Sequence, residues 1–145
     1  MKKIQKIPLK EFNKIYSRVP RLCIEACIIN SQGIILTKRN IRPAKGKWHF
    51  PGGTLMLKER LMDAVKRIAF RETGLKVEPK KILGIIEYPN FKGDIGHPIS
   101  ICFLAVIKGG TLQHDGDATD IRFFKKLPRP IIKEHADFIS KNIKL

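Results

Sequence analysis

Apolar residues recur with a helical period between positions 59 and 73. Leu61, Val65 and Ile68 are separated by four and three residues, so they share one face of a helix. Gly74 follows directly, and glycine is common just beyond a helix C-terminus. The pattern therefore predicts an amphipathic helix over 59–73 that buries one of its faces.

Apolar segments with strand character flank this helix on both sides. The runs 22–30 and 34–39 are β-rich, and the Ser31-Gln32-Gly33 turn between them predicts a hairpin. The remaining pattern predicts strands at 77–88, 98–108 and 120–128, a turn at Gly109-Gly110, and further helices at 9–17 and 131–143. Strands interleaved with helices indicate an α/β fold, in which a mixed sheet lies between helices.

Length and composition are consistent with one domain. The chain has 145 residues, of which 43% are hydrophobic, enough for a single core over 1–145. Cys23, Cys27 and Cys102 form no paired motif and lie in apolar runs, so we interpret them as reduced core thiols. No apolar run is long enough for a signal peptide or a membrane span. The sequence therefore predicts a cytoplasmic protein without a membrane partner.

The chain is strongly basic. Lys and Arg number 29 against 13 Asp and Glu, which gives a formal net charge of +16. Such a charge attracts polyanions, so nucleic-acid binding is one interpretation. The basic residues are scattered, however, and no recognition helix, RNA-binding aromatic strand or zinc knuckle accompanies them. We therefore favour phosphorylated small molecules as partners over nucleic acid.

Glu72 occupies an unusual position for a carboxylate. It extends the apolar stripe that contains Val65 and Ile68, where an unpaired charge is poorly solvated. It also lies near the helix C-terminus, where the helix dipole disfavours negative charge. Two penalties at one position indicate a compensating cation. The alternative is that fraying of the helix end lets Glu72 reach water or a lysine.

Glu72 belongs to a longer motif that begins at the last glycine of the segment HFPGG (49–53). The motif has the spacing G-x5-E-x7-R-x4-E-x-G, and its members are Gly53, Glu59, Arg67, Glu72 and Gly74. The segment 53–75 resembles the Nudix box, a loop–helix–loop whose helix presents glutamates to Mg²⁺ or Mn²⁺ coordinated by a pyrophosphate. The resemblance implies a Nudix-type α/β/α sandwich over essentially the whole chain. The alternative is a capped amphipathic helix that follows a glycine turn.

Two positions depart from the full Nudix box. Ile68 and Arg71 stand where the box has glutamates, so two of its three helix carboxylates are missing. A hard divalent ion takes about six oxygen ligands, and this helix offers few. We therefore expect weak binding of one Mg²⁺ or Mn²⁺ ion, completed by water and by substrate phosphates. The alternative is a catalytically inactive nucleotide- or RNA-binding module.

The GDP-mannose mannosyl hydrolases are a branch of the family that lacks the same two glutamates. This chain resembles them also in the segment KRNIRPAKGKWHFPGG and in an acidic residue of the first strand, here Glu25. The resemblance implies that Arg39 steadies the departing diphosphate and that Glu72 and the Gly52 carbonyl bind the metal. Both a guanidinium and a metal neutralise charge that grows on a leaving phosphate. In that branch water attacks the anomeric carbon of the sugar, so the nucleoside diphosphate leaves intact.

The similarity to this branch ends in the loop before the last strand. The mannosyl hydrolases have a metal-binding glutamine and a general-base histidine there, and the alignment puts Asp117 and Ala118 at these positions. Asp117 is therefore a candidate metal ligand, whereas Ala118 cannot accept a proton. His114 lies four residues upstream in the same loop and is the candidate base. The alternative is that His114 is a solvated loop residue.

Three more residues are candidates for the site or its surroundings. Arg42 is a candidate phosphate clamp, with a solvated surface arginine as the alternative. Glu25 alternates with apolar neighbours, so it faces either the substrate site or a salt bridge, and we favour the site. For Trp48 we favour the core over stacking on a base.

These features predict a metal-dependent Nudix hydrolase that cleaves a nucleoside-diphosphate-linked small molecule. The leading substrate is a nucleotide sugar such as GDP-mannose. The alternative enzyme is a pyrophosphohydrolase that attacks phosphorus in a nucleoside triphosphate or a dinucleotide. The sequence leaves the oligomeric state open, a homodimer included.

Overall fold

The computed structural model of the protein describes residues 6–42, 44–89 and 96–145. Its strands form a seven-stranded sheet with the main order β3-β2-β1-β6-β5, while β4 pairs with β1 and β7 pairs with β2. The strands are β1 (Pro20–Asn30), β2 (Gly33–Arg39), β3 (Trp48–His49), β4 (Gly52–Thr54), β5 (Leu75–Glu87), β6 (His97–Gly110) and β7 (Ala118–Phe124). The helices are α1 (Leu9–Tyr16), α2 (Leu61–Thr73) and α3 (Lys133–Asn142).

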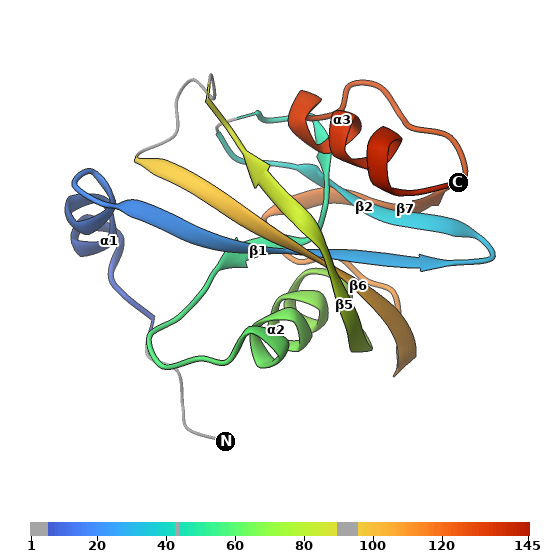
Figure 1. Cartoon of the computed structure of the whole chain (residues 1–145), viewed down its shortest axis with the longest axis horizontal. Coiled ribbons are helices and arrows are strands. Elements are labelled where there is room, and N and C mark those ends of the chain that lie inside the picture. Colours follow the sequence, from blue (N-terminus) through green and yellow to red (C-terminus); the bar gives the residue numbers. More distant parts are fainter. Residues whose placement is uncertain (1–5, 43, 90–95) are drawn as a thin grey trace.

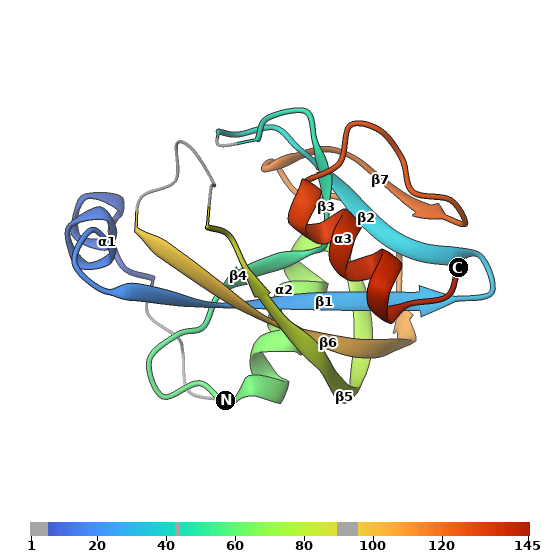
Figure 2. The same ribbon diagram turned by 45° about the horizontal axis from the view of Figure 1, so that its top comes forward.

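The sheet is mixed, as expected. β1 and β6 run parallel, whereas β5–β6 and β1–β4 are antiparallel. The parallel pair sits in the centre of the sheet, where both faces are covered by other elements. Figures 1 and 2 show α2 and α3 on opposite sides of this sheet, with α1 beside the start of β1. The predicted Nudix-type sandwich is confirmed.

The alternation of side chains along β1 divides the core between the two faces of the sheet. Ile24, Ala26 and Ile28 pack with the buried face of α2. Cys27 lies on the other face and packs in the cluster that contains Phe138 of α3. Successive residues of a strand point to opposite faces, so Glu25 shares the α3 side of the sheet with Cys27. This position places a carboxylate inside an apolar strand.

Helix α2 follows the predicted pattern closely. It begins at Leu61 rather than at position 59, and it buries Val65 and Ile68. Gly74 ends it in the left-handed conformation with φ 74°. A Cβ at Gly74 would lie 2.2 Å from the Thr111 carbonyl oxygen, so both the backbone conformation and the available space require glycine.

Several predicted boundaries were wrong. Gly109 and Gly110 do not form a turn between strands: they end β6 and pair with Lys76 and Leu75 of β5. The last strand covers Ala118–Phe124 rather than 120–128. Strands β3 and β4 were missed, because two or three residues are too few to show an alternation of apolar and polar side chains. Both strands also pair only with segments that lie further away in the sequence. Pro43, in the predicted loop 40–48, lies outside the described residues.

Trp48 and the cysteines lie in the core, as predicted. Trp48 is buried, and its ring meets Phe124 edge-on with a centroid separation of 4.7 Å. Cys23, Cys27 and Cys102 are all buried, and none of the three forms a disulfide. Within the described part of the chain, the helices are too short or too polar to span a membrane.

Candidate active site

One pocket brings together six of the residues proposed from the sequence. It has a volume of about 210 Å³ and lies where β1, β2, β4, the end of α2 and the loop before β7 meet. The predicted residues that line it are Glu25, Arg39, Gly52, Gly53, Glu72 and Asp117. They come from five separate segments, so their convergence results from the tertiary fold.

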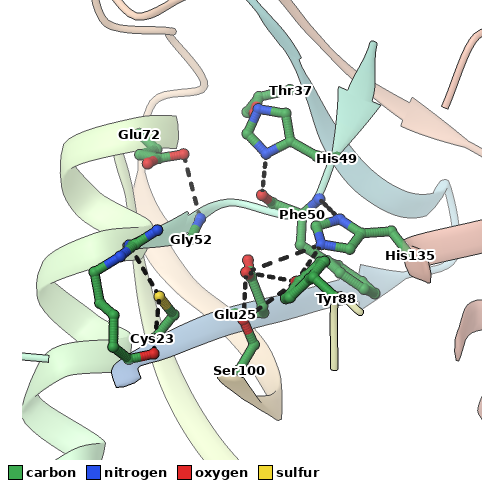
Figure 3. Close-up of polar contacts among 11 residues, drawn as sticks. Cys23, Glu25, Thr37, His49, Phe50, Gly52, Glu72, Tyr88, Ser100 and His135 are labelled. Atoms are coloured by element: carbon green, nitrogen blue, oxygen red, sulfur yellow. Dashed lines mark hydrogen bonds and ion pairs between the residues drawn. The ribbon is translucent and has the colours of Figure 1, made fainter. Parts of the chain in front are cut away.

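Glu72 points toward the glycine loop, as the resemblance to the Nudix box implies. Its Oε2 accepts a hydrogen bond from the Gly52 backbone N–H at 3.4 Å (Figure 3). Only 14% of its side chain is exposed, and the Arg71 guanidinium lies 3.8 Å from Oε1. Burial is the main cause that raises the pKa of Glu72 to about 7. The charge of Arg71 lowers this pKa in part, and the charge of Asp115 raises it further.

Glu25 lies directly opposite Gly52 in the antiparallel β1–β4 pair. Its Oε1 accepts hydrogen bonds from Ser100 Oγ at 3.0 Å and from Tyr88 Oη at 3.3 Å. Burial raises the pKa of Glu25 to about 8, and the neighbouring Glu72 adds to this effect. Two carboxylates are therefore buried on either side of Gly52, an arrangement that an added cation would stabilise.

Gly52 is required by this arrangement for steric reasons. A Cβ at position 52 would lie 1.9 Å from Glu25 Oε2, closer than two such atoms can approach. The Gly52 N–H points to Glu72, and in a strand the N–H and the carbonyl of one residue point to the same side. The Gly52 carbonyl therefore faces the side of the strand on which Glu72 lies.

Two buried histidines hold the Phe50 backbone and Tyr88 next to the site through hydrogen bonds. His49 donates from Nδ1 to the Phe50 carbonyl, and its Nε2 contacts Thr37 Oγ1 at 3.2 Å. His135 accepts from the Phe50 N–H at 3.1 Å and contacts Tyr88 Oη at 2.7 Å (Figure 3). Burial lowers the pKa of His49 to about 4 and that of His135 well below its usual range. Both rings are therefore neutral, with both nitrogens engaged.

Positive charge surrounds the two carboxylates. Arg21, Arg39 and Arg71 all line the pocket. Arg39 ends β2, and its backbone is held by Lys47 and Gly46 through hydrogen bonds of 3.0 and 2.8 Å. Three guanidinium groups around a small pocket suit an anionic ligand such as a phosphate.

Two predicted candidates lie away from this pocket. His114 is exposed, and its Nδ1 contacts the neighbouring Asp115 carbonyl at 3.1 Å. Arg42 is also exposed, and among the described residues neither it nor His114 belongs to the pocket lining. Asp117 does line the pocket but is exposed to solvent, at its outer edge. Their functional roles remain predictions.

Sequence reasoning missed several residues of the site. They come from strands, a loop and a helix far from the motif, and they are His49, Tyr88, Ser100, Asp115 and His135. The sequence feature that could have predicted some of them is a single polar residue within an apolar segment. Ser100 is such a residue among the buried positions of β6, and His135 is one on the buried face of α3. Nothing in their local sequence indicates that Tyr88, Ser100 and His135 meet at Glu25.

The family model of the NUDIX domain matches residues 19–138. The chain belongs to the Nudix family. An ADP-ribose pyrophosphatase of Methanocaldococcus jannaschii is 35% identical over 121 residues, which cover 83% of this chain and 70% of that protein. The low-salt glycan biosynthesis protein Agl8 of Haloferax volcanii is 29% identical over 125 residues, covering 83% and 80%.

Solved structures agree at the level of the fold. A MutT Nudix hydrolase from Burkholderia pseudomallei superimposes with a TM-score of 0.75 at 24% identity, covering 84% of this chain and 97% of that one. These relatives support the Nudix family as a whole, whereas the mannosyl-hydrolase branch stays a prediction.

Two residues of the Nudix box, Glu59 and Arg67, hold the loop onto α2. Arg67 donates from Nε and Nη2 to the Glu59 carboxylate at 2.7 and 2.9 Å, and from Nη2 to the Thr54 carbonyl at 3.0 Å. Glu59 also accepts the Met56 N–H at 3.1 Å, and its side chain is only 2% exposed. In this Nudix protein the pair is a structural brace that connects β4 to α2.

Replacing Arg67 with methionine should therefore destabilise the fold. Arg67→Met leaves the buried Glu59 carboxylate without its partner, and breaking such a pair costs about 3 kcal/mol. Urea denaturation measures the free energy of unfolding. Lys66→Met is the matched control, because Lys66 pairs with Glu78 at the surface, with both side chains about half exposed. Equal losses for the two variants would contradict a bracing role.

The metal-free protein should lose stability as the pH rises. The pKa of Glu25 is raised from 4.5 to about 8 and that of Glu72 from 4.5 to about 7. The folded state keeps protons that the unfolded chain releases. The contribution of these two carboxyl groups to the free energy of unfolding is therefore fully present below pH 4.5, and it is lost as the pH rises through their folded-state pKa values. From pH 7 to 8, where the buried His49 and His135 are largely neutral in both the folded and the unfolded state, we expect a loss of about 1 kcal/mol.

Urea unfolding with a chelator at pH 7 and 8 tests this expectation. Glu25→Gln removes the group with the higher pKa, so its unfolding free energy should change less over the same interval. A wild-type protein that gains stability from pH 7 to 8 would contradict the proposed burial of both carboxyls.

The described residues include no group of three or more side chains of the metal-binding types that could hold an ion. A pair of buried carboxylates and a backbone carbonyl fit a cation that depends on substrate oxygens for the rest of its ligands. The donor set is all oxygen, which suits Mg²⁺ or Mn²⁺.

Proposed function

We propose that this Nudix protein is a metal-dependent hydrolase that cleaves a nucleoside diphosphate linked to a sugar. The observation that carries the proposal is the convergence of Glu72, Gly52 and Arg39 in one pocket. The Glu72 carboxylate is suited to bind a metal ion, and the Arg39 guanidinium is suited to bind a phosphate. Nudix hydrolases generally depend on a divalent metal. The name of the M. jannaschii relative, ADP-ribose pyrophosphatase, supports a nucleoside diphosphate linked to a sugar as the substrate class, and the H. volcanii relative is named for glycan biosynthesis.

The metal in this proposal is Mg²⁺ or Mn²⁺, held by the Glu72 carboxylate and the Gly52 carbonyl. Asp117 at the edge of the pocket is a further candidate ligand. When bound, the ion supplies Lewis-acid neutralisation of the negative charge on the diphosphate. Arg39 and Arg71 hold the remaining phosphate oxygens, because a guanidinium can donate two parallel hydrogen bonds to one phosphate.

The site favours attack of water at phosphorus over attack at the anomeric carbon. Attack at carbon in the mannosyl-hydrolase pattern relies on a histidine at the position of Ala118, and Ala118 lines the pocket here. His114, the candidate substitute, lies outside the pocket lining among the described residues. Hydrolysis of GDP-mannose at carbon is the second candidate, supported by the loop motif around Arg39.

Product analysis separates these candidates. The purified protein is incubated with ADP-ribose, GDP-mannose, other nucleoside diphosphate sugars and nucleoside triphosphates, each with Mg²⁺ or Mn²⁺. A nucleoside monophosphate with a sugar phosphate indicates P–O cleavage, and a nucleoside diphosphate with a free sugar indicates C–O cleavage. Binding of nucleotide or RNA without turnover under either metal would overturn the proposal and favour an inactive binding module.

Arg39→Lys should lower kcat/KM on the best diphosphate substrate at least about tenfold, or about 1.4 kcal/mol. The substitution keeps the charge but loses the planar pair of donors, so it is not conservative at a phosphate site. Lys141→Gln is the control, since Lys141 is exposed on α3 and contributes only to a field that salt screens beyond about 10 Å. Equal steady-state parameters for both variants would show that Arg39 acts only through its charge.

A further inference from the structure

The two oxygens of the Glu25 carboxylate have very different surroundings. Oε1 accepts hydrogen bonds from Ser100 and Tyr88 at 3.0 and 3.3 Å. Oε2 is buried and has no hydrogen-bond partner within the described residues. The whole residue is only 7% exposed. A buried carboxylate oxygen without a donor is costly, so its retention calls for a ligand that the protein itself does not supply.

A directed chain of hydrogen bonds fixes the orientation of this carboxylate. His135 is neutral and accepts the Phe50 N–H at Nδ1, so its proton is on Nε2 and is donated to Tyr88 Oη. The Tyr88 hydroxyl then donates to Glu25 Oε1 (Figure 3). Together with Ser100, this chain saturates Oε1, and it leaves Oε2 as the oxygen with free acceptor capacity.

Oε2 is directed at the backbone of Gly52. It lies 1.9 Å from the position that a Cβ of residue 52 would occupy. The N–H of the same glycine is hydrogen-bonded to Glu72 Oε2 at 3.4 Å. Both carboxylates therefore adjoin one residue, and Figure 3 shows them approaching it from β1 and from α2.

We propose that Glu25 is a second carboxylate ligand of the catalytic cation, through Oε2, and that it stands in for the helix glutamates replaced by Ile68 and Arg71. This inference rests on the proposed function. In this chain the sheet thus supplies a ligand that the degenerate helix has lost. A metal–oxygen distance of about 2.1 Å is shorter than the donor–acceptor distance of a hydrogen bond. An ion can therefore bind an oxygen that is too closely packed to accept a hydrogen bond from water.

Mn²⁺ binding to the purified full-length protein tests the role of Glu25. Free Mn²⁺ is followed by electron paramagnetic resonance, with and without ADP as a source of phosphate oxygens. Glu25→Gln keeps the acceptor at Oε1 and removes the anionic ligand, so we expect its Mn²⁺ affinity to be at least tenfold weaker under both conditions. Glu87→Gln is the matched control, because Glu87 is exposed and lies outside the pocket lining, and it should bind Mn²⁺ like the wild type.

A second measurement does not depend on the folding of any variant. In crystals of the wild-type protein soaked with Mn²⁺ and ADP, the anomalous peak should lie about 2.1 Å from Glu25 Oε2. A peak bound to Glu72 but distant from Oε2 would overturn the inference, and so would wild-type affinity in Glu25→Gln.

These outcomes are distinguishable from failure of the proposed function. If the wild type turns over a nucleoside diphosphate sugar while Glu25→Gln keeps its full Mn²⁺ affinity, only the inference about Glu25 is wrong. If the wild type binds no Mn²⁺ even with ADP and turns over no substrate, the proposed function and the inference both fail.

Discussion

Glu72→Gln is expected to lower kcat at least about a thousandfold, or about 4 kcal/mol of transition-state stabilisation, while the fold stays intact. The amide keeps an oxygen that can accept the Gly52 N–H, but it removes the negative charge that faces the pocket. A neutral amide is a weak ligand for a hard divalent ion, so charge on the diphosphate would no longer be neutralised. Steady-state assays with saturating Mg²⁺ measure the effect on turnover.

Thermal unfolding at pH 8 provides the control for Glu72→Gln. The wild-type carboxylate is buried and ionised at this pH, with a pKa raised to about 7, so the variant should be as stable as the metal-free wild type or more stable. Loss of turnover together with a lower melting temperature would indicate misfolding instead. Turnover within tenfold of the wild type would contradict a metal-binding role for Glu72.

Gly52→Ala should reduce turnover at least about a hundredfold, because the new Cβ would overlap Glu25 Oε2 at 1.9 Å and Cδ at 2.6 Å. Glu25 cannot swing aside without breaking its contacts with Ser100 and Tyr88. The strain therefore shifts either the carboxylate or β4, and a displacement of about 1 Å at a reacting centre costs roughly this factor. Assays of kcat/KM on the best substrate measure it.

Two comparisons make the steric argument specific. Gly109→Ala is the matched control, because a Cβ at Gly109 would meet no atom within 4 Å, and its activity should equal that of the wild type. Gly52→Ala should cost about 1–3 kcal/mol of stability in the wild type but less in a Glu25→Ala background, where the overlap is absent. Equal costs in both backgrounds would show that Glu25 is not the obstacle.

Features that depend on neighbouring residues could be predicted from the sequence. The apolar period predicted α2 to within two residues of its start, and Gly74 ends the helix for both conformational and steric reasons. The resemblance of 53–75 to the Nudix box implied that the Glu72 carboxylate faces the glycine loop, and its Oε2 accepts the Gly52 N–H. Such patterns act within a few turns of chain, where local geometry determines the result.

Strand pairing was less accessible to sequence reasoning. Gly109 and Gly110 have the composition of a turn, yet they pair with Lys76 and Leu75 of β5, beyond an irregularity that shifts the register of the β5–β6 ladder between Lys76 and Val77. Strands β3 and β4 exist through their pairing with β2 and β1, not through any propensity of their own. Contacts between distant segments override weak local preferences.

The surroundings of Glu25 separate what the sequence determined from what only the tertiary structure decided. The sequence by itself determined that an acidic residue stands inside an apolar strand and that a Nudix box follows it. Only the tertiary structure decided which groups surround that acid: Ser100 and Tyr88 lie 75 and 63 residues away in the chain. The mixed sheet and α3 bring them to one oxygen and leave the other against Gly52, because a hydrogen-bond network in a closed core is specified by packing rather than by spacing along the chain.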